Sequence, residues 1–77
     1  MTTSIYAPPE QRIDELTSRE VEVMHLLTHG YQYKQIAQML VISIKTVESH
    51  VSAILRKLQV SNRTELTRWA ALSGVLR

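Results

Sequence analysis

The chain of 77 residues contains no cysteine and no phenylalanine, and it has only one tryptophan, two glycines and two prolines. Without cysteine it can form neither a disulfide nor a thiolate metal site, and a reducing cytoplasm suits such a composition. No apolar run approaches the roughly 18 residues that predict a membrane helix, and the N-terminus lacks the apolar core of a signal peptide. We therefore expect one small cytoplasmic domain, which buries about 60% of its unfolded surface.

There is also little excess of either sign of charge, since the formal net charge is only +2, but the charged residues are unevenly distributed. Residues 1–30 hold five acidic and two basic side chains, a balance of −3, whereas residues 31–77 hold two acidic and seven basic ones, a balance of +5. Small helical proteins can carry such asymmetry by chance. A basic C-terminal half is nevertheless what a phosphate-binding surface requires.

Residues 33–58 predict two helices joined by a tight turn. The second helix begins after Ser43, whose hydroxyl suits an N-cap. Its apolar stripe has helical period and consists of Val47, Val51, Ile54 and Leu58. Because the opposite face is polar, this helix suits insertion into the major groove of DNA.

Two further helices are expected to flank this pair. Thr17 and Glu20 have the spacing of a capping box, and the helix that they start should end at Gly30 in a left-handed conformation. A last helix should run from about residue 63 to residue 73, with Asn62 as its N-cap. Its single tryptophan, Trp69, is either a core residue or a dimer anchor, and the core is favoured.

The fold class expected from these elements is all-α, with four helices in residues 16–77. Residues 1–15 show no sustained period and contain a Pro-Pro pair at positions 8 and 9. Consecutive prolines disfavour a helix. We therefore interpret residues 1–15 as a flexible N-terminal arm or linker.

Many fixed offsets along the chain agree with one family pattern. The matching residues are Leu16-Thr17-x-Arg19-Glu20-x-Glu22-Val23, Lys34-x-Ile36-Ala37, Thr46-Val47, His50-Val51 and Lys57-Leu58-x-Val60-x-Asn62-Arg63-Thr64-Glu65. In this pattern the sequence resembles the LuxR/FixJ/GerE-type (NarL-like) helix-turn-helix domain. The resemblance implies a tetra-helical domain that binds double-stranded DNA as a dimer and regulates transcription. The chain would be either a small free-standing regulator or the effector domain of a response regulator.

The outward face of the helix at about 44–58, aligned with the family's reading positions, supplies most of the candidate DNA contacts, and the start of the preceding helix supplies Tyr33 and Lys34. Candidates for base contact are Lys45, Glu48, Ser49 and Ser52, because their side chains can pair with base edges. Candidates for phosphate contact are Lys34, Tyr33, Thr46, Arg56 and Lys57. Glu48 stands where many family members have Lys or Arg, which suggests a different base preference.

The resemblance also implies a homodimer on DNA through the fourth helix, for which the candidates are Thr67, Arg68 and Ala71. It further implies a structural ion pair of Arg63 with Glu20 or Glu22, and RNA polymerase as a further partner. We expect no enzyme activity, because no nucleophile–base pair or phosphate-cradling loop is visible. We also expect no cofactor, no metal, no membrane association and no small-molecule ligand in this domain.

Two other functions remain open at this point. The chain could be a stand-alone interaction module that heterodimerises with a LuxR-type regulator and modulates it without needing DNA. It could also be the promoter-reading region of a sigma factor, which has a similar helix-turn-helix, although the start of the first helix and the cap at Asn62 argue against this. His25 and His29 lie at i, i+4 and could bind a metal with a third ligand, but surface or capping histidines are favoured.

Overall fold

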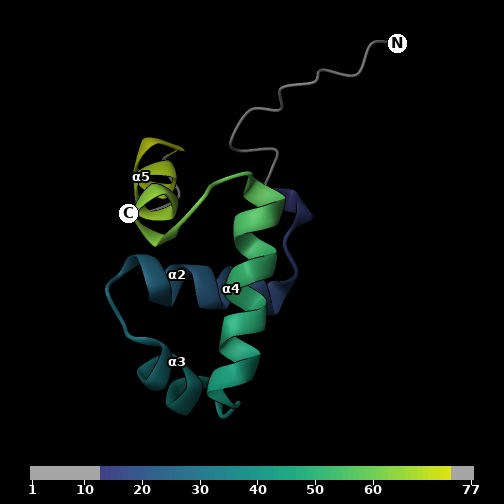
Figure 1. The fold of residues 1–77 in the computed structure, drawn as a ribbon, viewed down its shortest axis with the longest axis vertical. Helices are drawn as coiled ribbons and strands as arrows, with labels where there is room; N and C mark the ends of the chain where they lie inside the picture. The colour runs from purple at the N-terminus through teal and green to yellow at the C-terminus, as the bar shows by residue number, and fades with distance from the viewer. Residues whose placement is uncertain (1–12, 74–77) are drawn as a thin grey trace.

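The computed structural model describes residues 13–73 and confirms the all-α fold class (Figure 1). The elements are a 3-10 turn η1 (Ile13–Glu15), followed by α2 (Ser18–Thr28), α3 (Tyr33–Leu40), α4 (Ile44–Leu58) and α5 (Arg63–Ser73). Within residues 13–73 there is no strand, and no helix is long and apolar enough to cross a membrane. The turn η1 falls in the stretch expected as an arm, and residues 1–12 of that stretch lie outside the described residues.

The helix starts follow the capping residues that the sequence predicts. At α2, the Glu20 N–H donates to Thr17 Oγ1 at 3.1 Å, and the Thr17 N–H donates to Glu20 Oε1 at 3.0 Å, so the capping box is complete. At α4, the Thr46 N–H donates to Ser43 Oγ at 3.0 Å. The start of α3 is held differently, because the Gln35 side-chain oxygen accepts from the Gln32 N–H at 2.8 Å.

Three helices end in the same left-handed motif, although only one of them ends at a glycine. Gly30 after α2 has φ 98°, as predicted, but Val41 after α3 and Gln59 after α4 also have positive φ, at 57° and 59°. In each case the next N–H bonds a carbonyl five residues back, for example Ile42 to Ala37 at 2.9 Å and Val60 to Leu55 at 3.0 Å. This is the Schellman arrangement. The turn of the helix-turn-helix is thus made by a valine.

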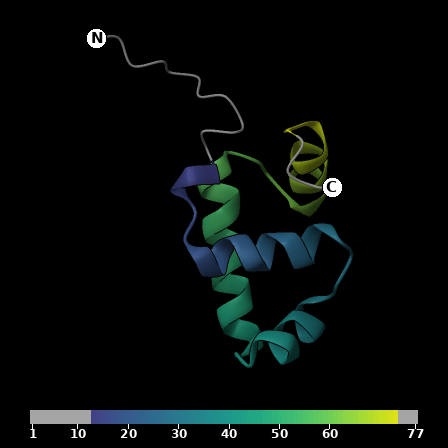
Figure 2. The ribbon, with the colours of Figure 1, turned by 180° about the vertical axis from the view of Figure 1, so that it is seen from behind.

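The four helices meet in one core in which α2 is the central scaffold. Helix α2 crosses α4, and both α3 and α5 pack on α2 (Figures 1 and 2). The predicted stripe of α4 is buried, since Val47, Ile54 and Leu58 are fully inaccessible and Val51 is nearly so. Trp69 of α5 joins the same core, which confirms the favoured interpretation of this residue. The burial of one stripe fixes which side of α4 faces outward.

Candidate nucleic-acid interface

The outer face of α4 forms a polar stripe directly opposite its buried one. Four of the candidate residues repeat at helical spacing along it and are all exposed: Lys45, Ser49, Ser52 and Arg56. Glu48 is exposed as well, on one border of the stripe. Because these residues are exposed, no other helix of residues 13–73 covers this side of α4. Figure 1 shows α4 crossing in front of α2. The structure therefore places the predicted base-contact residues together on one accessible face.

The N-terminal end of α4 brings a helix dipole to the same face. Ser43 caps the helix, and its hydroxyl also lies 2.9 Å from the hydroxyl of Thr46. The first N–H groups of a helix carry partial positive charge and favour an anion such as a phosphate. At the other end, Arg56 lies in the last turn, where a cation also suits the dipole.

Two other phosphate candidates lie on α3. Lys34 is exposed, whereas Tyr33 is half-buried and packs against the core. Both belong to the first turn of α3, whose start has no acidic residue. The structure therefore leaves the Lys34 ammonium accessible and gives Tyr33 a packing role in addition to any phosphate contact.

Lys57 differs from the other phosphate candidates, because the structure gives its ammonium a partner within the domain. Lys57 Nζ donates to Glu20 Oε1 at 2.8 Å, and the two side chains are 27% and 8% exposed. Burial alone would raise the pKa of Glu20. The hydrogen bonds from Lys57 and from the Thr17 N–H, together with the charges of Lys57 and His50, outweigh burial and lower this pKa below its ordinary value. Glu20 therefore stays ionised, and Lys57 is neutralised by an acid of α2.

The predicted pairing of Arg63 with Glu20 or Glu22 is not the arrangement in the structure. Arg63 Nη2 donates to the carbonyl oxygens of Leu27 at 3.2 Å and Tyr31 at 2.9 Å, at the C-terminal end of α2. Glu20 lies in the first turn of α2, so seven residues and about 10 Å of helix separate it from Leu27. Glu22 instead pairs with Arg19 at 3.2 Å on the surface. Arg63 therefore stabilises the end of α2 and its following loop rather than an ion pair.

The dimer candidates on α5 fall on its outer side, together with a residue that sequence reasoning missed. Arg68 and Ala71 are exposed, whereas Thr67 is half-buried and its hydroxyl donates to the Arg63 carbonyl at 3.1 Å. Leu72 lies beside them and is 81% exposed. Its position four residues after Arg68, outside the buried stripe of α5, is the signal that could have identified it.

His25 and His29, for which surface or capping roles are favoured over a metal site, gain no third ligand among the described residues. Their rings stack at 6.4 Å between centroids, and His29 Nδ1 lies 2.6 Å from the His25 carbonyl oxygen. Among residues 13–73, no group of three potential ligands lies close enough to hold a metal ion.

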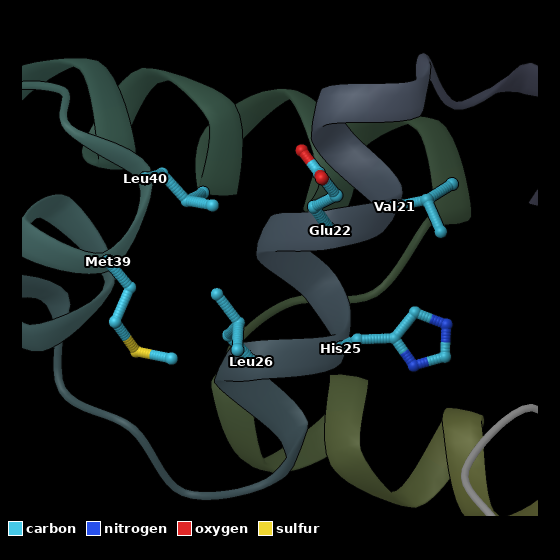
Figure 3. Close-up of a pocket in the computed structure, with 6 residues that line it drawn as sticks. All are labelled: Val21, Glu22, His25, Leu26, Met39 and Leu40. Atoms are coloured by element: carbon cyan, nitrogen blue, oxygen red, sulfur yellow. The ribbon is translucent and has the colours of Figure 1, made fainter.

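A shallow apolar groove of about 380 Å³ lies between α2 and α3. Figure 3 shows Leu26 of α2 opposite Met39 of α3, with Glu22 and Leu40 at the same groove. Met39 is half exposed. Nothing in the sequence had singled out this groove.

Comparison with known proteins places these features in a family. Residues 14–70 match the model of the family described as bacterial regulatory proteins, luxR family. The chain is 52% identical over 50 residues to the transcriptional regulatory protein DegU of Brevibacillus brevis, covering 65% of this chain and 21% of that protein. It is 44% identical over 66 residues to the transcriptional activator protein ExaE of Pseudomonas putida, covering 86% of this chain and 31% of that protein.

A third relative is the oxygen regulatory protein NreC of Staphylococcus carnosus, which is 42% identical over 61 residues, covering 79% of this chain and 28% of that protein. The chain thus spans less than a third of the length of each of these relatives. The matched residues begin at η1 and extend through most of α5, so they include every element of the helix-turn-helix. On this match the chain belongs to the LuxR family of bacterial regulatory proteins, whose helix-turn-helix domain it contains.

Proposed function

We propose that this chain binds double-stranded DNA sequence-specifically, as a dimer, and regulates transcription in the cytoplasm. The observation that carries the proposal is the exposed polar stripe on α4, formed opposite its fully buried stripe. A helix of 15 residues held in this way can enter the major groove with its N-terminal turns first. Membership of the family and relatives that are named as transcriptional regulators agree with this function.

The contacts divide into those that read sequence and those that supply affinity. Base edges would be read by Lys45, Glu48, Ser49 and Ser52, with Glu48 accepting from a cytosine amino group. Phosphates would be bound by Lys34, Tyr33, Thr46, Arg56 and the N-terminus of α4. Lys57 is a poorer phosphate ligand than the sequence predicts, because its ammonium is already paired.

The dimer would form through the outer side of α5, where Leu72 adds an apolar contact to Arg68 and Ala71. Two copies related by a two-fold axis would place two α4 helices on half-sites of an inverted repeat. RNA polymerase is the further partner through which a promoter-bound regulator acts.

The test is a fluorescence-anisotropy titration against a randomised duplex pool at low and moderate salt, followed by sequencing of the bound fraction. We expect affinity that falls steeply with salt and enrichment of an inverted repeat. Ser49→Ala should change the preferred base at one position of each half-site, whereas Arg56→Gln should weaken binding to all sequences alike. Arg19→Gln removes the same charge from α2 and serves as the matched control, with unchanged affinity expected.

The competing function is an interaction module that pairs with a full-length LuxR-type regulator, and the exposed Leu72 on α5 is the observation that favours it. The two functions can be distinguished by mixing the chain with such a regulator and measuring whether heterodimers form. Absence of DNA binding at low salt, together with heterodimers that persist in a Lys45→Ala, Arg56→Gln double variant, would refute DNA reading and establish the module.

A further inference from the structure

Glu20 is the single buried charged residue in the part of the chain that the structure describes, with 6% of its surface exposed. One of its oxygens, Oε1, accepts two hydrogen bonds, from the Thr17 N–H at 3.0 Å and from Lys57 Nζ at 2.8 Å. The first bond belongs to the capping box of α2, and the second comes from the last turn of α4. One carboxylate oxygen therefore connects the start of α2 to the end of α4 through hydrogen bonds.

The position of Lys57 around α4 explains why it meets Glu20 instead of solvent. An α-helix turns by about 100° per residue, so Lys57 points well away from its exposed neighbour Arg56. By the same geometry Lys57 shares a flank with His50, seven residues earlier, whose charge also acts on Glu20. This flank faces α2, whereas Lys45, Ser49 and Arg56 occupy the outer stripe.

We infer that Glu20 is a positioning residue that withholds Lys57 from the DNA backbone; the inference rests on the proposed function. Moving Lys57 to a phosphate would leave the buried Glu20 carboxylate without its charge partner, and an unpaired buried charge is strongly unfavourable. A partly buried pair is also screened little by salt. The pair thus prevents Lys57 from contributing to phosphate binding, which is independent of DNA sequence. The DNA contacts of α4 then come from its outer stripe.

The salt dependence of DNA binding tests this assignment, because each phosphate contact adds about 0.9 to the slope of log affinity against log salt. The slope would be measured on a random-sequence duplex for the wild type, Glu20→Gln, Lys57→Met and the double variant. Glutamine keeps an acceptor for the capping box, and methionine keeps much of the apolar stem of lysine. Circular dichroism at the assay temperature would confirm that each variant is folded.

We expect Lys57→Met to leave the slope unchanged and Glu20→Gln to steepen it by about 0.9, because the freed ammonium gains a phosphate. Between about 50 and 200 mM salt the Glu20→Gln protein would then lose about 3.5-fold more affinity than the wild type. In the double variant the slope should return to the wild-type value. Arg56→Met, which removes the adjacent cation on the outer stripe, is the positive control and should lower the slope by about 0.9.

A slope lowered by about 0.9 in Lys57→Met, with no increase in Glu20→Gln, would overturn the inference and show that Lys57 binds phosphate. Lys57→Met leaves the buried Glu20 carboxylate without its partner, so if either single variant does not fold, the double variant decides. A slope equal to that of the wild type then supports the inference, and a slope lowered by about 0.9 refutes it. A wild type without affinity for any duplex would refute the proposed function itself. If the wild type binds DNA but the slope of Lys57→Met is lower, only the inference about Glu20 and Lys57 fails.

Discussion

The turn of the helix-turn-helix offers a direct test of backbone strain, because Val41 holds the left-handed conformation with φ 57° and ψ 50°. A residue with a β-carbon pays about 1–2 kcal/mol there, and a β-branched residue is especially unsuited to it. The valine gains little in return, since it is 88% exposed. Val41→Gly should therefore stabilise the domain, although it replaces a valine with the most flexible residue.

The expected size follows from three contributions. Relief of strain gives about 1.5 kcal/mol, the greater freedom of glycine in the unfolded chain costs about 0.7 kcal/mol, and the small buried part of valine costs about 0.2 kcal/mol. The net gain is about 0.6 kcal/mol, which corresponds to an increase in Tm of about 3 °C for a domain of this size. Val41→Asn should gain about 5 °C, because asparagine tolerates this conformation without the entropic cost of glycine.

Thermal unfolding followed by circular dichroism measures these shifts. Gln38→Gly is the matched control, since residue 38 is exposed within α3 and has ordinary helical geometry. There a glycine should lower the Tm by about 5 °C, as it costs about 1 kcal/mol inside a helix. A Tm that falls in both Val41→Gly and Val41→Asn would refute the reasoning and mean that the valine side chain stabilises the turn through its own contacts.

Two further predictions concern charged side chains that bond to or within α2. Arg63→Met should lower the Tm by about 10 °C, because it removes charge-assisted hydrogen bonds worth about 2 kcal/mol. Arg68→Met, on the exposed side of α5, is the control and should leave the Tm unchanged. Equal Tm values for the two variants would contradict the role of Arg63. The pKa of Glu20 is lowered in the folded state, so its contribution to stability is complete above its ordinary pKa of 4.5 and is lost as the pH falls through the folded value. In urea unfolding the wild type should therefore be more stable than Glu20→Gln at pH 7, and the difference should shrink at about pH 3; a constant difference would show that Glu20 has the same pKa in both states.

The sequence predicted the helices well because their signals are local. The capping box of Thr17 and Glu20, the cap at Ser43 and the buried stripe of α4 each depend on residues within a few turns of one another. Gly30 was recognised as a helix end because glycine favours positive φ. Val41 carries no such signal. The Schellman hydrogen bonds around it hold it in the left-handed region, and nothing in the neighbouring sequence distinguishes it from a valine with ordinary backbone geometry.

The partners of charged side chains were harder to predict, because they depend on how helices cross. The Lys57–Glu20 pair joins residues 37 positions apart, and Arg63 reaches carbonyl oxygens 32 and 36 positions away. Backbone carbonyls have no sequence signature, and the family resemblance implied an acidic partner for Arg63 instead. The exposed face of α4 was predictable, because it follows from the stripe that is buried.

The way α5 is attached has a consequence for local unfolding. Helix α4 packs on both α2 and α3, whereas α5 packs chiefly on α2. An element held mainly on one side can open without disrupting the rest, so amide hydrogens of α5 should exchange through a partial opening of lower free energy than global unfolding. If two copies pair through α5, association would raise the free energy of this partial opening, because α5 must be folded to form the interface. The helix that is least anchored within the domain would then be stabilised by the dimer.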